Sequence, residues 1–171
     1  TRSLSLAALD RILRLAEGKG AVALGPGLGT HPEPQELIRR LVAELPCPVI
    51  LDADGITAFA GQAERLAHAG GSLILTPHPG ELSRLLAVER SALLRQRLAL
   101  VPETAARLGI TLLLKTARTL IAGPEGEAVI VPTGNPGMAT GGSGDVLTGM
   151  IAARAAQAPP TALAAAAGAD L

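Results

Sequence analysis

The sequence has almost no aromatic side chains: its 171 residues include one phenylalanine, Phe59, and no tryptophan or tyrosine. Proteins that bind single-stranded nucleic acid stack the bases on aromatic rings, and this chain has almost nothing from which to build such a surface. The charges also balance, with 15 basic and 15 acidic residues. A basic surface is therefore not predicted, and we expect no nucleic-acid partner.

Cysteine is scarce as well, and long apolar runs are absent. Cys47 is the one cysteine, which excludes an internal disulfide and any metal site built from several cysteines. No apolar stretch reaches about 18 residues without a charge, a proline or a glycine, so no membrane span is expected. The N-terminus has no basic start followed by an apolar run. No secretory signal is therefore predicted, and the expected location is cytoplasmic.

What the sequence does contain is a regular alternation of short apolar runs and stretches with helical periodicity. The runs predict strands at 21–24, 48–51, 72–75 and 110–114, followed by a hairpin of 119–122 and 128–131. The helical stretches are 33–45, 56–69, 81–87, 91–108 and 145–157. This order predicts an α/β fold with a mostly parallel central sheet flanked by helices on both faces. With no linker or internal repeat, residues 1–171 are expected to form a single domain.

Polar segments follow directly after four of the predicted strands. They are GPGLG at 25–29, DADG at 52–55, TPHPGE at 76–81 and the single residue Lys115. In open α/β sheets, ligands bind outside the carboxyl ends of the strands. We therefore expect these segments to meet at one edge of the sheet.

The glycine-rich segment before the last predicted helix carries the strongest local signal. Glycines at 141, 142 and 144 come just before Asp145. A helix N-terminus exposes free backbone N–H groups, and glycines let a phosphate approach them closely. The pattern predicts an anion site in which Asp145 takes the proton from an attacking hydroxyl. The alternative is that Asp145 only stabilises the start of the helix.

Two other segments each allow two interpretations. GPGLG does not match the spacing of a dinucleotide-binding motif. It is either a tight turn or a place where a flat ligand lies against bare backbone. His78 is either a ligand contact or a loop histidine that hydrogen-bonds its own turn, with Glu81 capping the next helix.

The acidic loop and the strand-end lysine also allow two interpretations. Lys115, followed by Thr116 and Thr119, suits nucleotide phosphates or ribose, unless it is a solvated lysine. Asp52 and Asp54 could bind Mg²⁺ or simply accept hydrogen bonds from loop amides. No residue is assigned as a metal ligand.

Taken in order, GPGLG, DADG, LTPHPGE, LLKTART and NPGMATGGSGDVLTG closely resemble the ADP/ATP-dependent NAD(P)H-hydrate dehydratases. The resemblance covers roughly residues 20–157 and is carried best by TPHPGE together with the last segment. It implies a ribokinase-like fold and repair of NADHX and NADPHX, the hydrated forms of the reduced nicotinamide cofactors. ADP or ATP would phosphorylate the ring hydroxyl of the S epimer with Mg²⁺ assisting, and elimination of phosphate would restore NAD(P)H.

The resemblance also implies roles for individual residues. Asp145 would be the catalytic base, with Gly142, Ser143 and Gly144 supplying the amides of the anion hole. The substrate contacts would include Gly27 or Gly29 in GPGLG, His78 and Asp145. The nucleotide-binding residues would be Lys115, Thr116, Ala117, Arg118, Thr119, Gly144 and Asn135. Family members often form homotetramers or larger assemblies, and many are fused to an epimerase domain.

The sequence departs from the family pattern in several places. The family usually has Lys-Gly where this chain has Lys115-Thr116, and DADA where it has DADG. The family domain usually begins well upstream with a further glycine-rich substrate loop, so we expect this chain to lack the family's N-terminal portion. Two alternatives remain: a ribokinase-like kinase of a thiamine-precursor alcohol, and a non-catalytic nucleotide-binding module.

Overall fold

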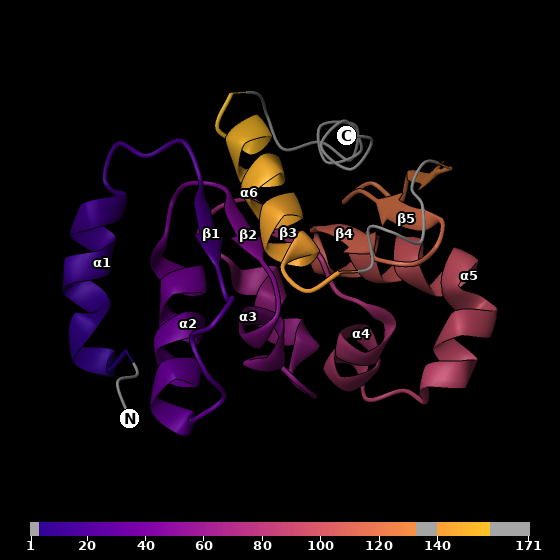
Figure 1. Cartoon of the computed structure of the whole chain (residues 1–171), viewed down its shortest axis with the longest axis horizontal. Coiled ribbons are helices and arrows are strands. Elements are labelled where there is room, and N and C mark those ends of the chain that lie inside the picture. The colour runs from indigo at the N-terminus through magenta and orange to yellow at the C-terminus, as the bar shows by residue number, and fades with distance from the viewer. Residues whose placement is uncertain (1–3, 133–139, 158–171) are drawn as a thin grey trace.

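The fold is taken from a computed structural model, which describes residues 4–132 and 140–157. The helices are η1 (Leu6–Ala8), α1 (Leu9–Ala16), α2 (Pro32–Glu44), α3 (Asp54–Thr57), η2 (Ala63–His68), α4 (Pro79–Leu86), α5 (Arg90–Leu108) and α6 (Ser143–Ala155), where η marks a 3₁₀-helix. The strands are β1 (Val22–Leu24), β2 (Val49–Leu51), β3 (Leu73–Leu75), β4 (Thr111–Leu114), β5 (Thr119–Ala122) and β6 (Ala128–Val131). Figure 1 shows their arrangement.

The strands form a six-stranded sheet in the order β1-β2-β3-β4-β5-β6. The pairs from β1 to β4 are parallel, whereas β5 pairs antiparallel with both β4 and β6, forming the predicted hairpin with β6. Every residue of β2, β3 and β4 is buried, as expected for parallel strands covered on both faces. The predicted mostly parallel sheet is confirmed.

Helices cover both faces, but unequally. Parallel strands that follow one another in chain order, joined by right-handed crossovers, bring the connecting helices to the same face. Accordingly α2, α4 and α5 share one large hydrophobic core with the sheet, to which they contribute Leu37, Leu82 and Leu108 respectively. The opposite face is covered by α6, which packs Ile151 and Ala155 in a second core. In Figure 1, α6 lies in front of β2 and β3.

The second core is small and lies next to the strand ends that matter for the site. It joins α6 to one buried residue from each of β2, β3 and β4, namely Ile50, Ile74 and Leu113. Side chains alternate between the two faces of a strand, so these three residues all face α6 while their chain neighbours face the large core. The second core therefore fixes the position of α6 on the sheet.

One predicted helix is wrong in extent. The sequence pattern predicts a single helix over 56–69, but the structure has the four-residue α3 and, after a break, the 3₁₀-helix η2. The break falls at Gly61, whose φ of 67° is left-handed and whose N–H donates to the carbonyls of Arg84 and Leu85 at the end of α4. This tertiary contact ends the helix locally.

The helices α1 and α5 differ in whether the sequence predicts them. The helix α1 precedes the first strand and has no counterpart among the predicted elements. In contrast, α5 runs unbroken through Pro102, in agreement with the helix predicted over 91–108. Within the described ranges, no helix is both long enough and apolar enough to cross a membrane.

Candidate active site

Polar side chains end three rows of apolar residues on the α6 side of the sheet. Side chains of a strand alternate between its two faces, so Asp52 continues the row of Ile50. Thr76 continues the row of Ile74 in the same way, and Lys115 that of Leu113. The sequence alternation therefore brings a carboxylate, a hydroxyl and an ammonium group to one edge of the sheet.

The helix α6 adds its own polar residues to this edge. Thr148, Ile151 and Ala155 are the buried residues of α6, and they have the spacing of a helical stripe. Gly144 lies one turn before Thr148 on the same stripe. The apolar part of the stripe holds α6 in place, and its N-terminal part therefore meets the strand ends.

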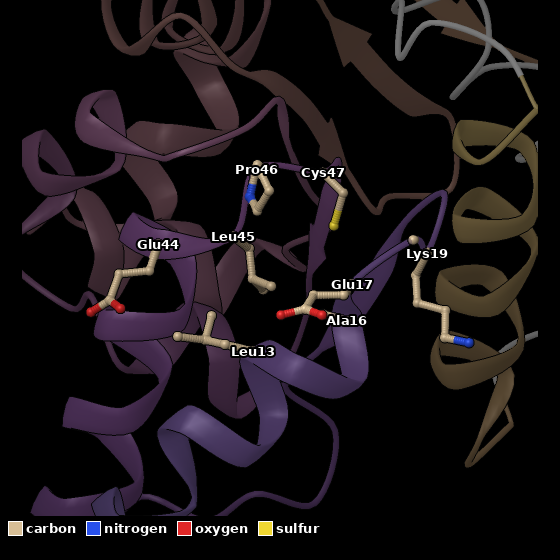
Figure 2. A pocket seen from close by; sticks show the side chains of 9 residues that line it. Leu13, Ala16, Glu17, Lys19, Glu44, Leu45, Pro46 and Cys47 are labelled. Carbon is tan, nitrogen blue, oxygen red and sulfur yellow. The ribbon is translucent and has the colours of Figure 1, made fainter.

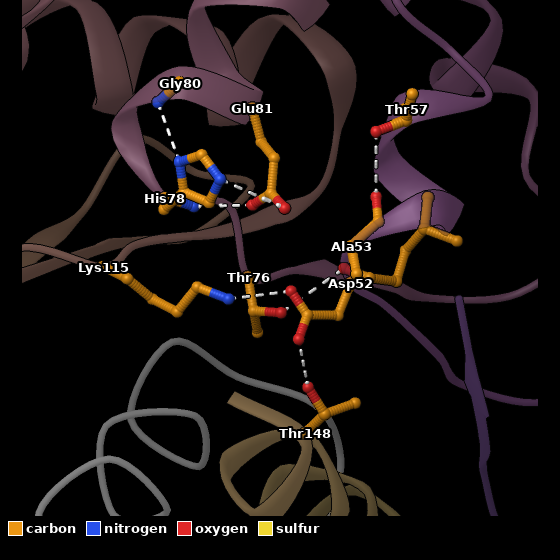
Figure 3. Close-up of polar contacts among 10 residues, drawn as sticks. Asp52, Ala53, Thr57, Thr76, His78, Gly80, Glu81, Lys115 and Thr148 are labelled. Atoms are coloured by element: carbon orange, nitrogen blue, oxygen red, sulfur yellow. Dashed lines mark hydrogen bonds and ion pairs between the residues drawn. The ribbon is translucent and has the colours of Figure 1, made fainter. Parts of the chain in front are cut away.

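Asp52 lies at the centre of the resulting cluster, shown in Figure 3. Its Oδ1 is 2.8 Å from Lys115 Nζ, and its Oδ2 accepts a hydrogen bond from Thr148 Oγ1 at 2.8 Å. Asp52 is only 2% exposed, whereas the Lys115 side chain is 25% exposed. Lys115 is therefore not the solvated lysine of the alternative interpretation: one side of its ammonium group is held, and the other remains accessible.

The N-terminus of α6 has the geometry of a glycine cradle. Gly142 is the N-cap, with a φ of 91° that favours glycine, and Asp145 is exposed in the first turn. The N–H of Gly144 has no acceptor among the described residues. A Cβ on Gly144 would lie 3.6 Å from both Asp52 Oδ2 and Lys115 Nζ. The Gly144 amide and the lysine thus lie close together, and Asp145 follows directly in the chain.

The DADG and GPGLG loops are joined by a hydrogen bond. Asp54 Oδ2 accepts a hydrogen bond from the N–H of Gly29 at 2.8 Å. Asp54 therefore binds a loop amide, which is one of the two roles that the sequence allowed for it. Gly25 is required here, because a Cβ would come within 1.9 Å of the Asp52 carbonyl oxygen. Gly27 and Gly29 have open space around them. Both remain predicted substrate contacts.

The turn between Asp52 and Asp54 is strained. Ala53 has φ 49° and ψ −118°, a combination that residues with a side chain rarely adopt and that is common where a fold positions functional groups. The strained residue lets the chain leave β2 sharply and enter α3. Asp52 consequently points to the α6 side of the sheet while Asp54 reaches Gly29.

His78 hydrogen-bonds its own turn and Glu81 caps the next helix, as the second of the two interpretations of His78 predicted. Its Nδ1 accepts a hydrogen bond from the N–H of Gly80 at 2.9 Å, and Glu81 accepts one from the N–H of His78 at 2.8 Å. This reciprocal arrangement is a capping box at the start of α4. Half of the His78 side chain is exposed. Its predicted contact with substrate would use this exposed side.

The predicted nucleotide-binding segment lines an open cavity. Thr116, Ala117 and Arg118 surround a volume of about 350 Å³ together with Leu94 and Arg97 of α5. Lys115 is anchored at one end of the segment by its N–H, which donates to the Pro77 carbonyl. Thr119 begins β5. Asn135, the last predicted nucleotide contact, lies outside the described residues.

A second cavity of about 330 Å³ lies at the opposite end of the sheet. It is bordered by the ends of α1 and α2 and by the loop that enters β2, with Lys19, Glu44 and Cys47 on its walls (Figure 2). It contains none of the predicted site residues. The strand ends, and not this cavity, are therefore the candidate site.

The acidic side chains of the site are compatible with only one mode of Mg²⁺ binding. No group of three or more His, Cys, Asp or Glu side chains within residues 4–132 and 140–157 could enclose a metal ion. Both Asp52 oxygens are already in use, and Asp54 binds a loop amide. Mg²⁺ commonly keeps its waters and is held by substrate phosphates with one or two carboxylates. The site thus suits Mg²⁺ that arrives with a nucleotide.

The fold and the site together define a protein of the ribokinase-like class. The chain superposes on a ribokinase-like superfamily protein of Enterococcus faecalis with a TM-score of 0.75 and 32% identity, over 97% of this chain and 57% of that one. Within this class, the chain belongs to the NAD(P)H-hydrate dehydratase family, whose model matches residues 4–171. The identification confirms the resemblance found in the motifs.

Individual relatives carry the same family description. The chain is 46% identical to a bifunctional NAD(P)H-hydrate repair enzyme of Moorella thermoacetica, over 99% of this chain and 32% of the relative. An ADP/ATP-dependent NAD(P)H-hydrate dehydratase of Bacillus subtilis, co-crystallised with ATP and Mg²⁺, superposes with a TM-score of 0.72 and 36% identity, over 90% of this chain and 56% of that one. The chain thus spans about a third to little more than half of these relatives.

A kinase is among the structural neighbours as well. A hydroxyethylthiazole kinase of Pyrococcus horikoshii matches with a TM-score of 0.68 but only 18% identity, over 94% of this chain and 63% of that one. At this identity the likeness concerns the fold alone.

Thr148 and the role of Asp52 were missed by the sequence analysis. The sequence suggested Asp52 only as a Mg²⁺ ligand or a partner of loop amides, and it did not single out Thr148. A signal for both exists: Thr148 is the one polar residue on the buried stripe of α6, and Asp52 ends the buried row of Ile50. A polar residue in such a place needs a partner.

Proposed function

We propose that this chain catalyses the ADP- or ATP-dependent dehydration of the S epimer of hydrated NADH and NADPH. The proposal is supported by one observation above all, the convergence of Lys115, the Gly144 amide and the exposed Asp145 at the N-terminus of α6. An ammonium group and helix amides stabilise phosphate charge, and a neighbouring carboxylate can accept a proton. Family membership supplies the substrate class.

In the first step, the ring hydroxyl of the hydrated cofactor attacks the terminal phosphorus of the nucleotide. Asp145 takes the hydroxyl proton, a new P–O bond forms, and the bond to the leaving AMP or ADP breaks. The amides of Gly142 and Gly144 and the ammonium group of Lys115 face the transferring phosphoryl group, whereas the N–H of Ser143, also predicted for the anion hole, donates to the Thr140 carbonyl in this structure. Mg²⁺ brought by the nucleotide would neutralise part of the phosphate charge.

In the second step, the phosphate ester eliminates. The carbon–oxygen bond breaks, inorganic phosphate leaves, and a proton is lost from the neighbouring ring carbon, so that the reduced nicotinamide ring is restored. The segment Lys115–Thr119 and its cavity hold the nucleotide. His78, Gly27 and Gly29 contact the hydrated cofactor from the neighbouring loops.

The test is an absorbance assay, because hydrated NADH lacks the near-ultraviolet band that NADH has. The chain is mixed with hydrated NADH, Mg²⁺ and either ADP or ATP, and a sample without nucleotide is the control. We expect the band to return only with nucleotide, and to be matched by an equal amount of inorganic phosphate. Nucleotide binding without any recovery of the band would contradict the proposal and favour a binding module.

We also propose that the protein forms a homo-oligomer of four or more subunits, as the family resemblance implies. Light scattering after size-exclusion chromatography measures the mass directly. A monomeric mass at micromolar concentration would contradict this part of the proposal.

A further inference from the structure

The buried carboxylate of Asp52 has no part in the mechanism described above. Its position is nevertheless unusual, because carboxylates are rarely this buried unless they are paired. Asp52 binds residues of two separate elements: Lys115 at the end of β4 and Thr148 in α6. These contacts join positions 63 and 96 residues away in the sequence.

Holding α6 on the sheet does not require this cluster. Ile151 and Ala155 already pack α6 against the central strands, and apolar side chains can replace a buried ion pair without loss of stability in many proteins. The contacts of Asp52 are therefore not explained by stability alone. What they do fix is the place of one flexible side chain, that of Lys115.

Fixing that place matters for anion binding. A lysine has a long, flexible stem, and an unrestrained ammonium group samples many positions. Here the Asp52 carboxylate holds Lys115 Nζ where a Cβ of Gly144 would be 3.6 Å from it. Thr148 donates to the other oxygen of the same carboxylate, so the carboxylate itself is held by α6. The lysine and the helix amides are thereby kept at one separation before any ligand binds.

We propose that Asp52 and Thr148 are positioning residues that set Lys115 against the N-terminal turn of α6, so that both meet the phosphates of the nucleotide together. The inference rests on the proposed function for the identity of the ligand. It assigns no contact with the reacting atoms to Asp52 or Thr148. They act through Lys115, and preorganisation of this kind strengthens binding by lowering the cost of ordering the site.

The test compares substitutions of Thr148 that keep or remove its hydroxyl. Thr148→Val removes the hydrogen bond to Asp52 at nearly constant volume, and Thr148→Ser keeps it. Thr104→Val is the matched control, since Thr104 is also a buried helix threonine, but its hydroxyl has no partner among the described residues. The affinity for ADP is measured by calorimetry, together with thermal unfolding.

We expect Thr148→Val to weaken ADP binding about tenfold, because a hydrogen bond to a charged group is lost. Thr148→Ser should restore the affinity to within about twofold, and Thr104→Val should leave it unchanged. Unchanged ADP affinity in Thr148→Val, or no rescue by serine at equal thermal stability, would overturn the inference.

A double-mutant cycle separates positioning from a merely structural role. If Thr148 acts through Lys115, then Thr148→Val should have little further effect on ADP affinity once Lys115→Met is present. If the two effects add, the inference is wrong. Should Thr148→Val fail to fold, Asp52→Asn takes its place in the cycle, because it removes the negative charge and keeps an oxygen acceptor.

A readout without nucleotide keeps this inference distinct from the proposed function. The chain has two lysines, Lys19 and Lys115, so the ammonium signals in ¹⁵N NMR can be assigned with a Lys115→Arg variant. We expect an ordered Lys115 signal in the wild type that broadens or shifts in Thr148→Val, while Lys19 is unaffected. If the wild type bound no ADP, the proposed function would fail, and the inference would stand or fall on this signal.

Discussion

At the scale of single residues, Gly144 shows how the absence of a side chain can serve function and not stability. A Cβ there would make ordinary contacts of 3.6 Å with Asp52 and Lys115, and the residue has a helical conformation. Alanine would therefore fit. It would also place a methyl group beside the backbone amide and the ammonium group of Lys115.

We predict that Gly144→Ala keeps or raises thermal stability, since alanine favours a helix by up to about 1 kcal/mol over glycine. ADP affinity should fall at least about tenfold, because the methyl group would obstruct the proposed contact of the Gly144 amide with phosphate. Gly149→Ala is the control, as Gly149 lies in the same helix with nothing within 4 Å of its would-be Cβ. Equal ADP affinity of the Gly144→Ala variant and the wild type would contradict the placement of the cradle.

Thr104 gives a residue-scale prediction about stability. Its hydroxyl is buried in α5 and finds no hydrogen-bond partner among the described residues. Replacing an unsatisfied buried hydroxyl with a methyl group removes a desolvation cost of about 1 kcal/mol or more. Thr104→Val should raise the midpoint of denaturant unfolding. A lower midpoint would show that the hydroxyl has a stabilising partner.

At the scale of elements, helix bounds could be predicted to within two residues, whereas a break inside a predicted helix could not. Proline at 79 and the pair His78 and Glu81 mark the start of α4 in the sequence, and the capping box confirms it. The break in the helix expected at 56–69 depends on the contact of Gly61 with the carbonyls of α4. Such a contact joins two elements, and a local pattern contains no information about it.

The N-terminus of α5 gives a pH-dependent prediction. Glu89 caps this helix, and hydrogen bonds from the Ser91 hydroxyl and then from the N–H groups of Ser91 and Ala92 lower its pKa from 4.5 to about 2. Because the pKa is lower in the folded state, Glu89 stabilises the fold above pH 4.5. This contribution is lost as the pH falls from 4.5 toward about 2.

Glu89→Gln should therefore lower the unfolding midpoint at neutral pH, and the difference from the wild type should shrink below pH 4.5. Unfolding in denaturant at a series of pH values measures it. Glu103→Gln, an exposed substitution on the same helix, serves as the comparison. A difference that is independent of pH would contradict the assigned role of the carboxylate.

At the scale of the whole molecule, the sheet is buried unevenly. The central strands β2, β3 and β4 are covered on both faces, whereas Val129 and Ile130 of the edge strand β6 are 38% and 49% exposed. Amide exchange reports local opening, and buried central strands open last. We predict that amides of β3 exchange most slowly and those of β6 much faster. Equal protection of β3 and β6 would contradict this order.

The sequence could predict the sheet because apolar runs and glycine-rich turns are local features. The parallel pairing followed from the alternation of strands with helices, and the meeting of polar segments at one edge followed from that pairing. The Asp52–Lys115–Thr148 cluster could not be predicted in the same way. It depends on how β4 and α6 lie relative to β2, and that arrangement is set by packing in the second core.

The central claim is that Asp145 activates the substrate hydroxyl at the glycine cradle, and Asp145→Asn tests it most directly. Asp10→Asn is the control, since Asp10 also lies exposed in the first turn of a helix, α1. Loss of a general base costs about 10²-fold or more in rate. We predict that Asp145→Asn loses recovery of the NADH band by this factor, binds ADP as the wild type does, and that Asp10→Asn is fully active. Full turnover by Asp145→Asn would contradict the account.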